Sequence, residues 1–292
     1  MLCDVRVLAP AKINIGLRVL PPRSDGFHNI ESIFQSVPLY DVLQIEVSDE
    51  KGNGCSVSCR DIDLPEKNTL TAAYQAFVCK TGVKSSVKVL LEKRIPHGAG
   101  LGGGSSDAAA LICALDKIFC TELTVSDLHE IAGSVGSDVF FFVDQQRCGH
   151  PFAALVEGRG ERVCSIAPRN DLFFVLVSPD VHSSTAEAYR LVDDWYGPQW
   201  SWKGPLIEDL ENMYRSPLDC WNFLNSFSDP LIQRYPLIQK ALEELVVSGA
   251  AYVQMSGSGS SVFGVFDSKQ RVDSAFLTLS DKWKRCYSFP SS

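Results

Sequence analysis

Apolar and polar residues alternate in some stretches of the chain and recur every three or four positions in others, which predicts strands and helices respectively. Strands are expected over residues 5–8, 13–20, 30–37, 41–47, 86–92, 172–177, 250–254 and 262–266. Helices are expected over about 69–80, 108–119, 124–132, 184–195, 230–247 and 272–279. Residues 48–63 are expected to be polar loop or edge structure, and residues 196–216 an irregular segment. The pattern is typical of an α+β protein.

A glycine-rich loop lies between the strand at 86–92 and the helix that follows it. Five glycines lie between Gly98 and Gly104, and Ser105, Ser106 or Asp107 is expected to cap the helix. Glycine lets backbone N–H groups approach an anion closely, and a helix N-terminus adds about half a positive charge. Serine hydroxyls can donate to phosphate oxygens. The loop therefore predicts a phosphate site, and a glycine turn without a ligand is the simpler alternative.

The familiar phosphate loops do not fit this stretch. No Gly-Lys-Ser/Thr follows the glycines, as a Walker A loop would require. Residues 98–103 satisfy G-x-G-x-x-G, but the next apolar run reaches its acidic residue only at Asp144, too far downstream for a dinucleotide-binding fold. The His-Arg-Asp and Asp-Phe-Gly motifs of protein kinases are missing from the sequence.

Composition limits the possible partners. The 292 residues are enough for about two domains, and 45% of them are hydrophobic. The net charge of −8 argues against nucleic acid or an anionic membrane as the main partner. Ten cysteines include no C-x-x-C pair, and no zinc-ligand spacing, signal peptide or membrane-spanning run occurs. These features favour a reducing cytoplasm.

The segment Pro-x-Gly-x-Gly-Leu-Gly-Gly-Gly-Ser-Ser-x-Ala-Ala resembles the phosphate loop of the GHMP small-molecule kinases. Its triple glycine is similar to that of the 4-diphosphocytidyl-2-C-methylerythritol kinases of the non-mevalonate isoprenoid pathway. The resemblance implies a ribosomal-S5-like N-terminal ATP-binding domain at 1–165 and a ferredoxin-like C-terminal domain at 166–292. It also implies ATP and Mg²⁺, with the ion bound mainly through the nucleotide. The implied ATP-binding residues are Asn68, Pro96, His97, Gly98, Ala99, Gly100, Leu101, Gly102, Gly103, Gly104, Ser105 and Ser106.

Two further segments are similar to family motifs around the reacting groups. Ala-Pro-Ala-Lys-Ile-Asn-Ile implies catalytic Lys12 and substrate-binding Asn14, although a lysine and an asparagine at a strand edge are more often merely solvated. Gly-Ser-Asp-Val implies that Asp138 is the catalytic base, where a helix cap or turn is the structural alternative. Lys12 beside Asp138 would favour the ionised carboxylate.

The remaining substrate contacts come from three other places in the chain. Asp-Gly-Phe-His implies that Phe27 stacks on cytosine and that His28 reads its edge, and Tyr189 would oppose Phe27 across the base. Thr185 lies four residues before Tyr189 on the same helix face. The third family motif implies further substrate-binding residues: Gly257, Ser258 and Gly259.

Four residues depart from the family pattern. Phe27 replaces the usual tyrosine, Phe140 replaces a proline after the base, and Phe223 and Asn225 replace two acids of an Asn-Asp-Leu-Glu motif. Stacking on cytosine survives the first change, and the contacts of the two acids are in question.

The resemblance implies transfer of a phosphoryl group from ATP to the 2-hydroxyl of 4-diphosphocytidyl-2-C-methylerythritol, by a monomer or weak homodimer. The alternatives are another GHMP kinase with mevalonate or homoserine as acceptor, a non-catalytic nucleotide sensor on the same fold, and a Rossmann oxidoreductase.

Overall fold

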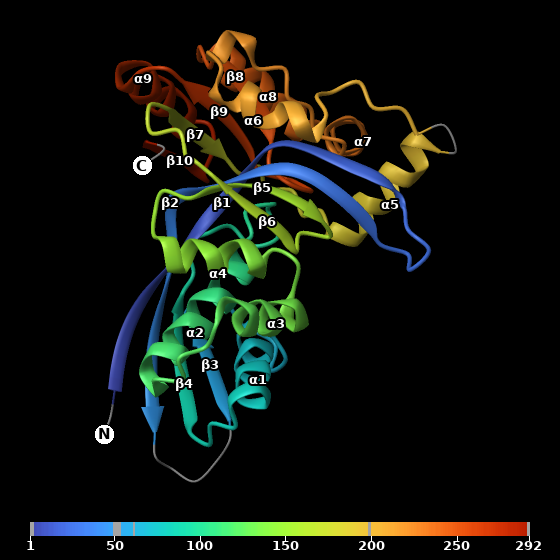
Figure 1. Ribbon diagram of the computed structural model, residues 1–292. Helices are drawn as coiled ribbons and strands as arrows, with labels where there is room; N and C mark the ends of the chain where they lie inside the picture. Colours follow the sequence, from blue (N-terminus) through green and yellow to red (C-terminus); the bar gives the residue numbers. More distant parts are fainter. Residues whose placement is uncertain (1–2, 49–53, 61, 198–199, 291–292) are drawn as a thin grey trace. The chain divides into compact units, whose positions relative to one another are not determined.

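The computed structural model describes residues 3–48, 54–60, 62–197 and 200–290 (Figure 1). Contacts between residues group the chain into two compact units that alternate along the sequence. Unit 1 comprises Met1–Ala11, Leu39–Ile95 and Gly102–His150, and unit 2 comprises Lys12–Pro38, Pro96–Leu101 and Pro151–Ser292. The division into domains at residue 165 stays a prediction.

The first two strands are each longer than expected. β1 runs through Cys3–Pro22 and β2 through His28–Ser48, where the sequence predicted two shorter strands in each case. β2 pairs with one neighbour over residues 30–35 and with another over 42–48. Pro38 lies between these two ladders, so its missing N–H removes no hydrogen bond from either. The strand therefore continues through a residue that looked like a break.

The described residues of unit 1 contribute one end of a six-stranded sheet and four helices (Figure 1). The end of β2 pairs antiparallel with β4 (Ser86–Glu92), and β4 pairs parallel with β3 (Cys55–Cys59). The helices are α1 (Thr69–Thr81), α2 (Gly103–Phe119), α3 (Val125–Val135) and α4 (Val139–Cys148). The predictions of β4, α1 and α3 are confirmed. β3 is the edge structure expected within 48–63, of which residues 49–53 and 61 lie outside the described residues.

The predicted cap of α2 is wrong. The helix begins at Gly103, before the serines, and its N-cap is Gly102 in the left-handed conformation with φ of +71°. No side chain makes a capping hydrogen bond there. Because glycine adopts this conformation without strain, the backbone enters the helix three to five residues earlier than a cap at Ser105, Ser106 or Asp107 would allow. Ser105 and Ser106 therefore lie in the first turn.

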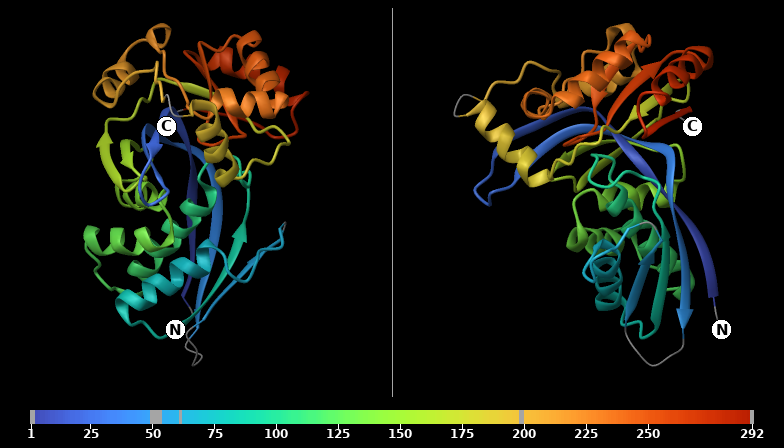
Figure 2. Two further views of the ribbon diagram at one scale, coloured as in Figure 1. Left: turned by 90° about the vertical axis from the view of Figure 1, so that its right-hand side faces the viewer. Right: turned by 180° about the vertical axis from the view of Figure 1, so that it is seen from behind.

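Unit 2 contains the start of β2, the hairpin of β5 (Ala153–Gly158) and β6 (Arg162–Ile166), and a separate four-stranded sheet. That sheet has the order β10-β7-β9-β8 and is antiparallel throughout: β7 is Phe173–Val177, β8 Tyr252–Met255, β9 Val262–Phe266 and β10 Cys286–Pro290. α8 (Pro236–Val247) precedes β8, and α9 (Lys269–Ser280) joins β9 to β10 (Figure 2). Along the chain the order is strand, helix, two strands, helix and strand. Together with the order of the strands in the sheet, this makes a ferredoxin-like domain, as expected.

The helices of unit 2 differ from the prediction in two places. α5 (Thr185–Tyr196) is confirmed, but α6 (Ile207–Arg215) and the short η1 (Leu218–Cys220) lie in the segment expected to be irregular. Ile207, Leu210, Met213 and Tyr214 recur at helical spacing in α6, so its period was present in the sequence and the prediction of an irregular segment is wrong there. The helix expected at 230–247 is two helices, α7 (Ser228–Arg234) and α8. Pro236 forces the preceding residue out of the helical conformation, and the first helix ends there.

The pairings of β2 with β4 and β5, and those of the four-stranded sheet, are antiparallel. In the described part of the chain there is accordingly no doubly wound parallel sheet, which the dinucleotide-binding alternative requires. The oxidoreductase alternative is therefore wrong. No helix among the described residues is long and apolar enough to cross a membrane.

Candidate active site

Lys12 and Asn14 lie on one face of β1, as their spacing predicts. The Lys12 ammonium donates to Oδ1 of Asn14 over 2.6 Å, and Nδ2 of Asn14 donates to Oγ of Ser32 over 3.2 Å. The ammonium also lies 4.6 Å from the centroid of the Phe34 ring. Lys12 is only 3% exposed, and burying an ammonium is costly unless its charge is compensated. The solvated alternative for these residues is thus excluded, and a buried cation of this kind is typical of a functional site.

The glycine loop and the β8–β9 loop meet beside this pair. Oγ of Ser256 donates to the carbonyl oxygen of Gly100 over 2.9 Å and accepts from the backbone N–H of Asn14 over 3.3 Å. The N–H of Lys12 donates to the carbonyl of Leu101 over 3.0 Å. Gly100 has φ of +76°, and a Cβ there would lie 2.1 Å from the Ser256 carbonyl oxygen. Only glycine fits this contact.

The residues predicted from the third motif lie in the same loop. A Cβ added to Gly257 would lie 3.1 Å from Oδ1 of Asn14, so the backbone passes close to that amide. Oγ of Ser258 lies 3.4 Å from Oγ1 of Thr185, the first residue of α5. Gly259 follows with φ of +76°. Three segments that are far apart in the sequence therefore converge within unit 2.

The second half of the glycine loop forms the N-terminus of α2 in unit 1. Ser106 is the first of these residues whose N–H is bonded within the helix, to the carbonyl of Gly102 over 2.9 Å. The preceding N–H groups of the first turn have no intrahelical partner. Oγ of Ser106 is fully buried and has no hydrogen-bond partner among the residues that the structure describes. The N–H groups at the start of α2 can therefore donate hydrogen bonds to a bound anion. Their contact with ATP stays a prediction.

Asn68 caps α1. Its Oδ1 accepts from the N–H groups of Leu70 and Thr71 over 3.0 and 3.1 Å, and its Nδ2 donates to the carbonyl of Pro65 over 2.9 Å. The hydroxyl of Thr71 accepts in return from the N–H of Asn68, which completes a capping box. The capping role is therefore confirmed, and the place of Asn68 beside adenosine stays a prediction.

Asp138 immediately precedes α4 and is half-buried. It takes the N-cap position, but its carboxylate makes no capping hydrogen bond to the helix. The ring of Phe140, two residues after Asp138, packs edge-on against His129, with centroids 5.3 Å apart. Phe140 is the second residue of the helix, where a proline is also tolerated, so this departure from the family pattern leaves the helix start intact. Asp138 belongs to unit 1 and Lys12 to unit 2, and their pairing stays a prediction.

His28 lies between two aromatic rings. The ring of Tyr189 stacks on it at 5.1 Å between centroids, and that of Trp200 stacks at 6.0 Å. Nδ1 lies 2.7 Å from the carbonyl oxygen of Leu20, which can only accept, so Nδ1 carries the proton. Nε2 lies 3.4 Å from Oδ1 of Asp193. The contact with Leu20 fixes the orientation of the ring and assigns a proton to Nδ1, and Nε2 is the nitrogen that faces away from it.

Phe27 keeps half of its surface exposed, and the guanidinium of Arg159 lies 3.8 Å from its ring centroid. Tyr189 stacks on His28, as described above, and makes edge contact with Phe227 at 5.0 Å between centroids. The sandwich of cytosine between Phe27 and Tyr189 stays a prediction.

Several residues at the site were missed by sequence reasoning. Trp200 stacks on His28 and donates its indole N–H to the carbonyl of Val19 over 3.0 Å. Arg159 covers Phe27, and a Cβ on Gly98 would lie 3.3 Å from the ring of His182. The close spacing of Trp200 and Trp202 was visible in the sequence but carried no sign of its partner.

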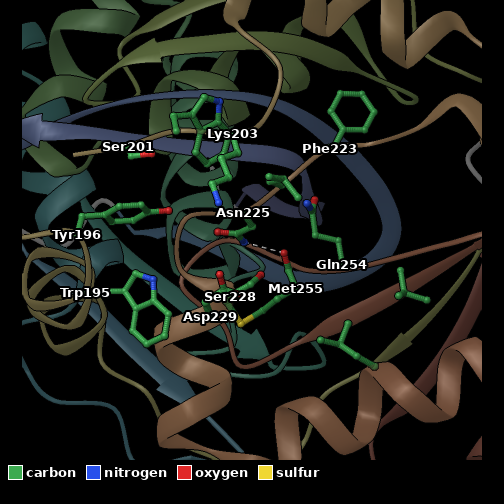
Figure 3. Close-up of a pocket in the computed structure, with 14 residues that line it drawn as sticks. Trp195, Tyr196, Ser201, Lys203, Phe223, Asn225, Ser228, Asp229, Gln254 and Met255 are labelled. Carbon is green, nitrogen blue, oxygen red and sulfur yellow. Dashed lines mark hydrogen bonds between the residues drawn. The ribbon is translucent and has the colours of Figure 1, made fainter. Parts of the chain in front are cut away.

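Phe223 and Asn225, which replace the two acids of the family motif, line a cavity of about 440 Å³ in unit 2 (Figure 3). Phe223 is buried against the ring of Trp221 at 5.2 Å between centroids, so it is a core residue here. Asn225 donates through Nδ2 to the carbonyls of Met255 and Gly257 over 2.8 and 2.9 Å. A carboxylate could not make these two bonds, because it has no proton to donate. The lining contains none of the predicted substrate-binding residues: Trp195, Tyr196, Ser201, Trp202, Lys203, Phe223, Leu224, Asn225, Ser228, Asp229, Leu242, Val253, Gln254 and Met255.

Comparisons with known proteins agree with this arrangement. Residues 68–146 match the model of the GHMP kinases N terminal domain, and residues 206–285 match that of the GHMP kinases C terminal domain. A 4-diphosphocytidyl-2-C-methyl-D-erythritol kinase from Treponema pallidum is 41% identical over 95% of both chains, and one from Chlorobium limicola is 34% identical over 95% of this chain and 94% of its own.

Solved structures give the same result. A crystal structure of 4-(cytidine 5'-diphospho)-2C-methyl-D-erythritol kinase superposes with a TM-score of 0.76 at 30% identity, covering 97% of this chain and 98% of the other. The mevalonate kinase of L. major shares the fold, with a TM-score of 0.70 at 15% identity over 100% of this chain and 98% of its own. The chain therefore belongs to the 4-diphosphocytidyl-2-C-methyl-D-erythritol kinase family of the GHMP kinases.

Proposed function

We propose that this protein transfers the γ-phosphoryl group of ATP to the 2-hydroxyl of 4-diphosphocytidyl-2-C-methyl-D-erythritol, in the non-mevalonate route to isoprenoid precursors. The convergence of Lys12, Asn14 and Ser256 on the glycine loop carries the proposal, because it joins three separate family motifs in one place. The membership of the chain in the kinase family supports the same reaction.

In the proposed reaction the acceptor oxygen attacks the γ-phosphorus, and the bond from that phosphorus to the oxygen of ADP breaks. Asp138 would accept the proton of the attacking hydroxyl. Lys12 would donate to the acceptor oxygen or to the transferring phosphoryl group, where its buried charge acts in a low dielectric. Phosphoryl transfer mainly needs alignment and neutralisation of charge, which these groups would supply.

The other end of the acceptor would be fixed through its base. Phe27 and Tyr189 would stack on cytosine, and His28 would form a hydrogen bond with the edge of the base. Because Nδ1 donates to Leu20, Nε2 is the nitrogen left for the base, and in the imidazole without a proton there it would accept from the exocyclic amino group of cytosine. Uracil has a carbonyl oxygen at that position, which would face a lone pair. Binding at the base would hold the distant hydroxyl in line for attack.

Magnesium fits the site as part of the nucleotide. Among the residues that the structure describes, no three His, Cys, Asp or Glu side chains converge to hold an ion. The phosphates of ATP would therefore carry most of the coordination, and the bound ion would neutralise charge on them. The proposal also places the enzyme in the cytoplasm, as a monomer or weak homodimer.

The test is ATP consumption by the purified protein with Mg²⁺ and each candidate acceptor in turn. The panel contains 4-diphosphocytidyl-2-C-methylerythritol, its uridine analogue, free methylerythritol phosphate, mevalonate and homoserine. Turnover confined to the cytidine-bearing acceptor is expected. Turnover with mevalonate or homoserine would overturn the assignment of substrate, and ATP binding without turnover on any acceptor would favour a nucleotide sensor.

A further inference from the structure

A buried cluster of three charged residues lies at the base of the glycine loop in unit 1. The ammonium of Lys93 contacts Oδ2 of Asp41 and lies 2.9 Å from Oδ2 of Asp107. The side chains of Lys93, Asp41 and Asp107 are 7%, 0% and 3% exposed. Burying three ionisable groups is expensive, and such clusters add little stability compared with apolar packing. The cluster therefore calls for a role other than stabilising the core.

One side of the cluster fixes the entry to the loop. Oδ1 of Asp41 accepts from the N–H groups of Arg94 and Ile95 over 2.6 and 2.8 Å. These residues directly precede Pro96, where the glycine loop begins. With two backbone donors and the ammonium of Lys93, both oxygens of Asp41 are bonded. Asp41 thus holds the chain at the point where β4 ends and the loop starts.

The other side fixes the exit from the loop. Asp107 is the fifth residue of α2, one turn after its start. A Cβ placed on Gly103 would lie 2.9 Å from Nζ of Lys93 and 3.1 Å from Cγ2 of Ile95. The first residue of the helix therefore rests directly on the ammonium and on the end of the entry segment. Lys93 binds the two ends of the loop to one another through Asp41 and Asp107.

We propose that Lys93 and Asp107 are positioning residues that set the glycine loop and the N-terminus of α2 at the spacing that the phosphates of ATP require. The inference rests on the proposed function only in taking ATP as the ligand of this loop. Neither side chain needs to touch the nucleotide. Displacing a binding loop by about 1 Å can cost on the order of 100-fold in rate, so a rigid base matters for the donors above it.

The two carboxylate oxygens of Asp107 differ in their contacts: Oδ2 bonds Lys93 and Oδ1 does not. Its Oδ1 is buried and has no hydrogen-bond partner among the described residues. The buried faces of α1, α3 and α4 that pack on α2 carry no charged side chain, so Lys93 and Asp41 are the charged groups that act on it. Replacement by asparagine keeps the shape and an acceptor for Lys93, whereas alanine removes the anchor of the helix start.

The experiment compares Asp107→Ala with Asp107→Asn in the full chain. Calorimetry measures binding of the β,γ-imido analogue of ATP with Mg²⁺ and, separately, of 4-diphosphocytidyl-2-C-methylerythritol. We expect Asp107→Ala to weaken nucleotide binding at least tenfold and Asp107→Asn to restore it to within about threefold. Binding of the cytidine ligand is expected to change less than twofold in both, because none of its predicted contact residues lies in the segment from Arg94 to Asp107 that the cluster holds.

Asp116→Ala is the matched control. Asp116 is on the same helix, about 14 Å further along, and its carboxylate accepts from Thr121 and Leu123. Its loss is expected to lower the melting temperature without changing nucleotide affinity. Equal nucleotide binding by Asp107→Ala and the wild type would overturn the proposal, as would equal losses of both ligands.

If Asp107→Ala does not fold, Lys93→Arg gives the same comparison, with exposed Lys88→Arg on β4 as its control. The larger guanidinium cannot fit beneath Gly103, so it must push the helix start outward. Nucleotide affinity within twofold of the wild type in folded Lys93→Arg would refute the positioning role. A wild type that binds ATP but turns over none of the acceptors would overturn the proposed function and leave this test intact.

Discussion

We expect the titration of Asp107 to make the stability of unit 1 change with pH. Burial raises the pKa of this carboxyl to about 7 from its ordinary 3.8; Lys93 opposes the rise and Asp41 adds to it. Between these two values the native protein holds a proton that the unfolded chain has released. Stability therefore falls as pH rises through this window, by about 1.4 kcal/mol per pH unit, and the fall is complete above pH 7. The loss is about 4 kcal/mol in total, of which about 3 kcal/mol falls between pH 5 and 8.

Asp107→Asn removes this titration while preserving the shape of the side chain. The wild type should lose about 3 kcal/mol of stability in α2 between pH 5 and 8 relative to the variant. Although burial lowers the pKa of Lys93, the carboxylates of Asp107 and Asp41 raise it on balance, so its ammonium stays charged over this range. The difference between the two proteins thus isolates one carboxyl.

The assay has to report on unit 1. All five tryptophans, from Trp195 to Trp283, belong to unit 2, so their fluorescence would follow the wrong part of the chain. Hydrogen exchange of the α2 amides, corrected for the intrinsic effect of pH, measures the opening free energy where Asp107 lies. Amides of β9 in unit 2 serve as the internal control. The same pH dependence of α2 opening in both proteins would refute the reasoning.

Three further substitutions test the site. Asp138→Asn should lower turnover by about 100-fold or more, while calorimetry shows unchanged binding of the cytidine substrate; a rate near that of the wild type would reject Asp138 as the base. Asn225→Asp deprives two carbonyls of their donor and should destabilise the protein by about 1–3 kcal/mol, whereas exposed Asn222→Asp should not, and equal melting temperatures would contradict this. Gly100→Ala places a Cβ 2.1 Å from the carbonyl oxygen of Ser256 and should raise the KM for ATP at least tenfold, which steady-state kinetics can disprove.

Local sequence signals were sufficient to predict the bounds of a helix or strand where that element depends mainly on its own residues. β4 was predicted to the residue because its alternation is bounded by polar turns. The start of α1 was predicted correctly because Asn68 is a strong cap, and the structure shows that it makes a complete capping box. The start of α2 was misplaced because serine and aspartate are the usual caps, while a left-handed Gly102 can do the same without a side chain. Local propensity gave no means of ranking these options.

Partners that lie far apart in the sequence could not be predicted in this way. His28 was chosen from its place beside Phe27, but its stacking between Tyr189 and Trp200 depends on tertiary packing across more than 150 residues. The same holds for Lys93, which nothing in the local sequence distinguishes from other charged residues after a strand. Its role can be inferred only from the fold, in which β2 and α2 bring the carboxylates of Asp41 and Asp107 into contact with it.

The total charge of the protein is a poor guide to anion binding for a related reason. With a net charge of −8 the chain should repel an anionic nucleotide and an anionic acceptor at long range. At physiological salt, however, charges more than about 8 Å apart in water are largely screened, whereas a buried ammonium acts at short range in a lower dielectric. In the proposed site such local donors would be Lys12 in unit 2, which is 3% exposed, and the N–H groups at the start of α2 in unit 1, which have no intrahelical partner. An acidic protein can therefore bind two anions, provided that the donors are few, buried and held rigidly.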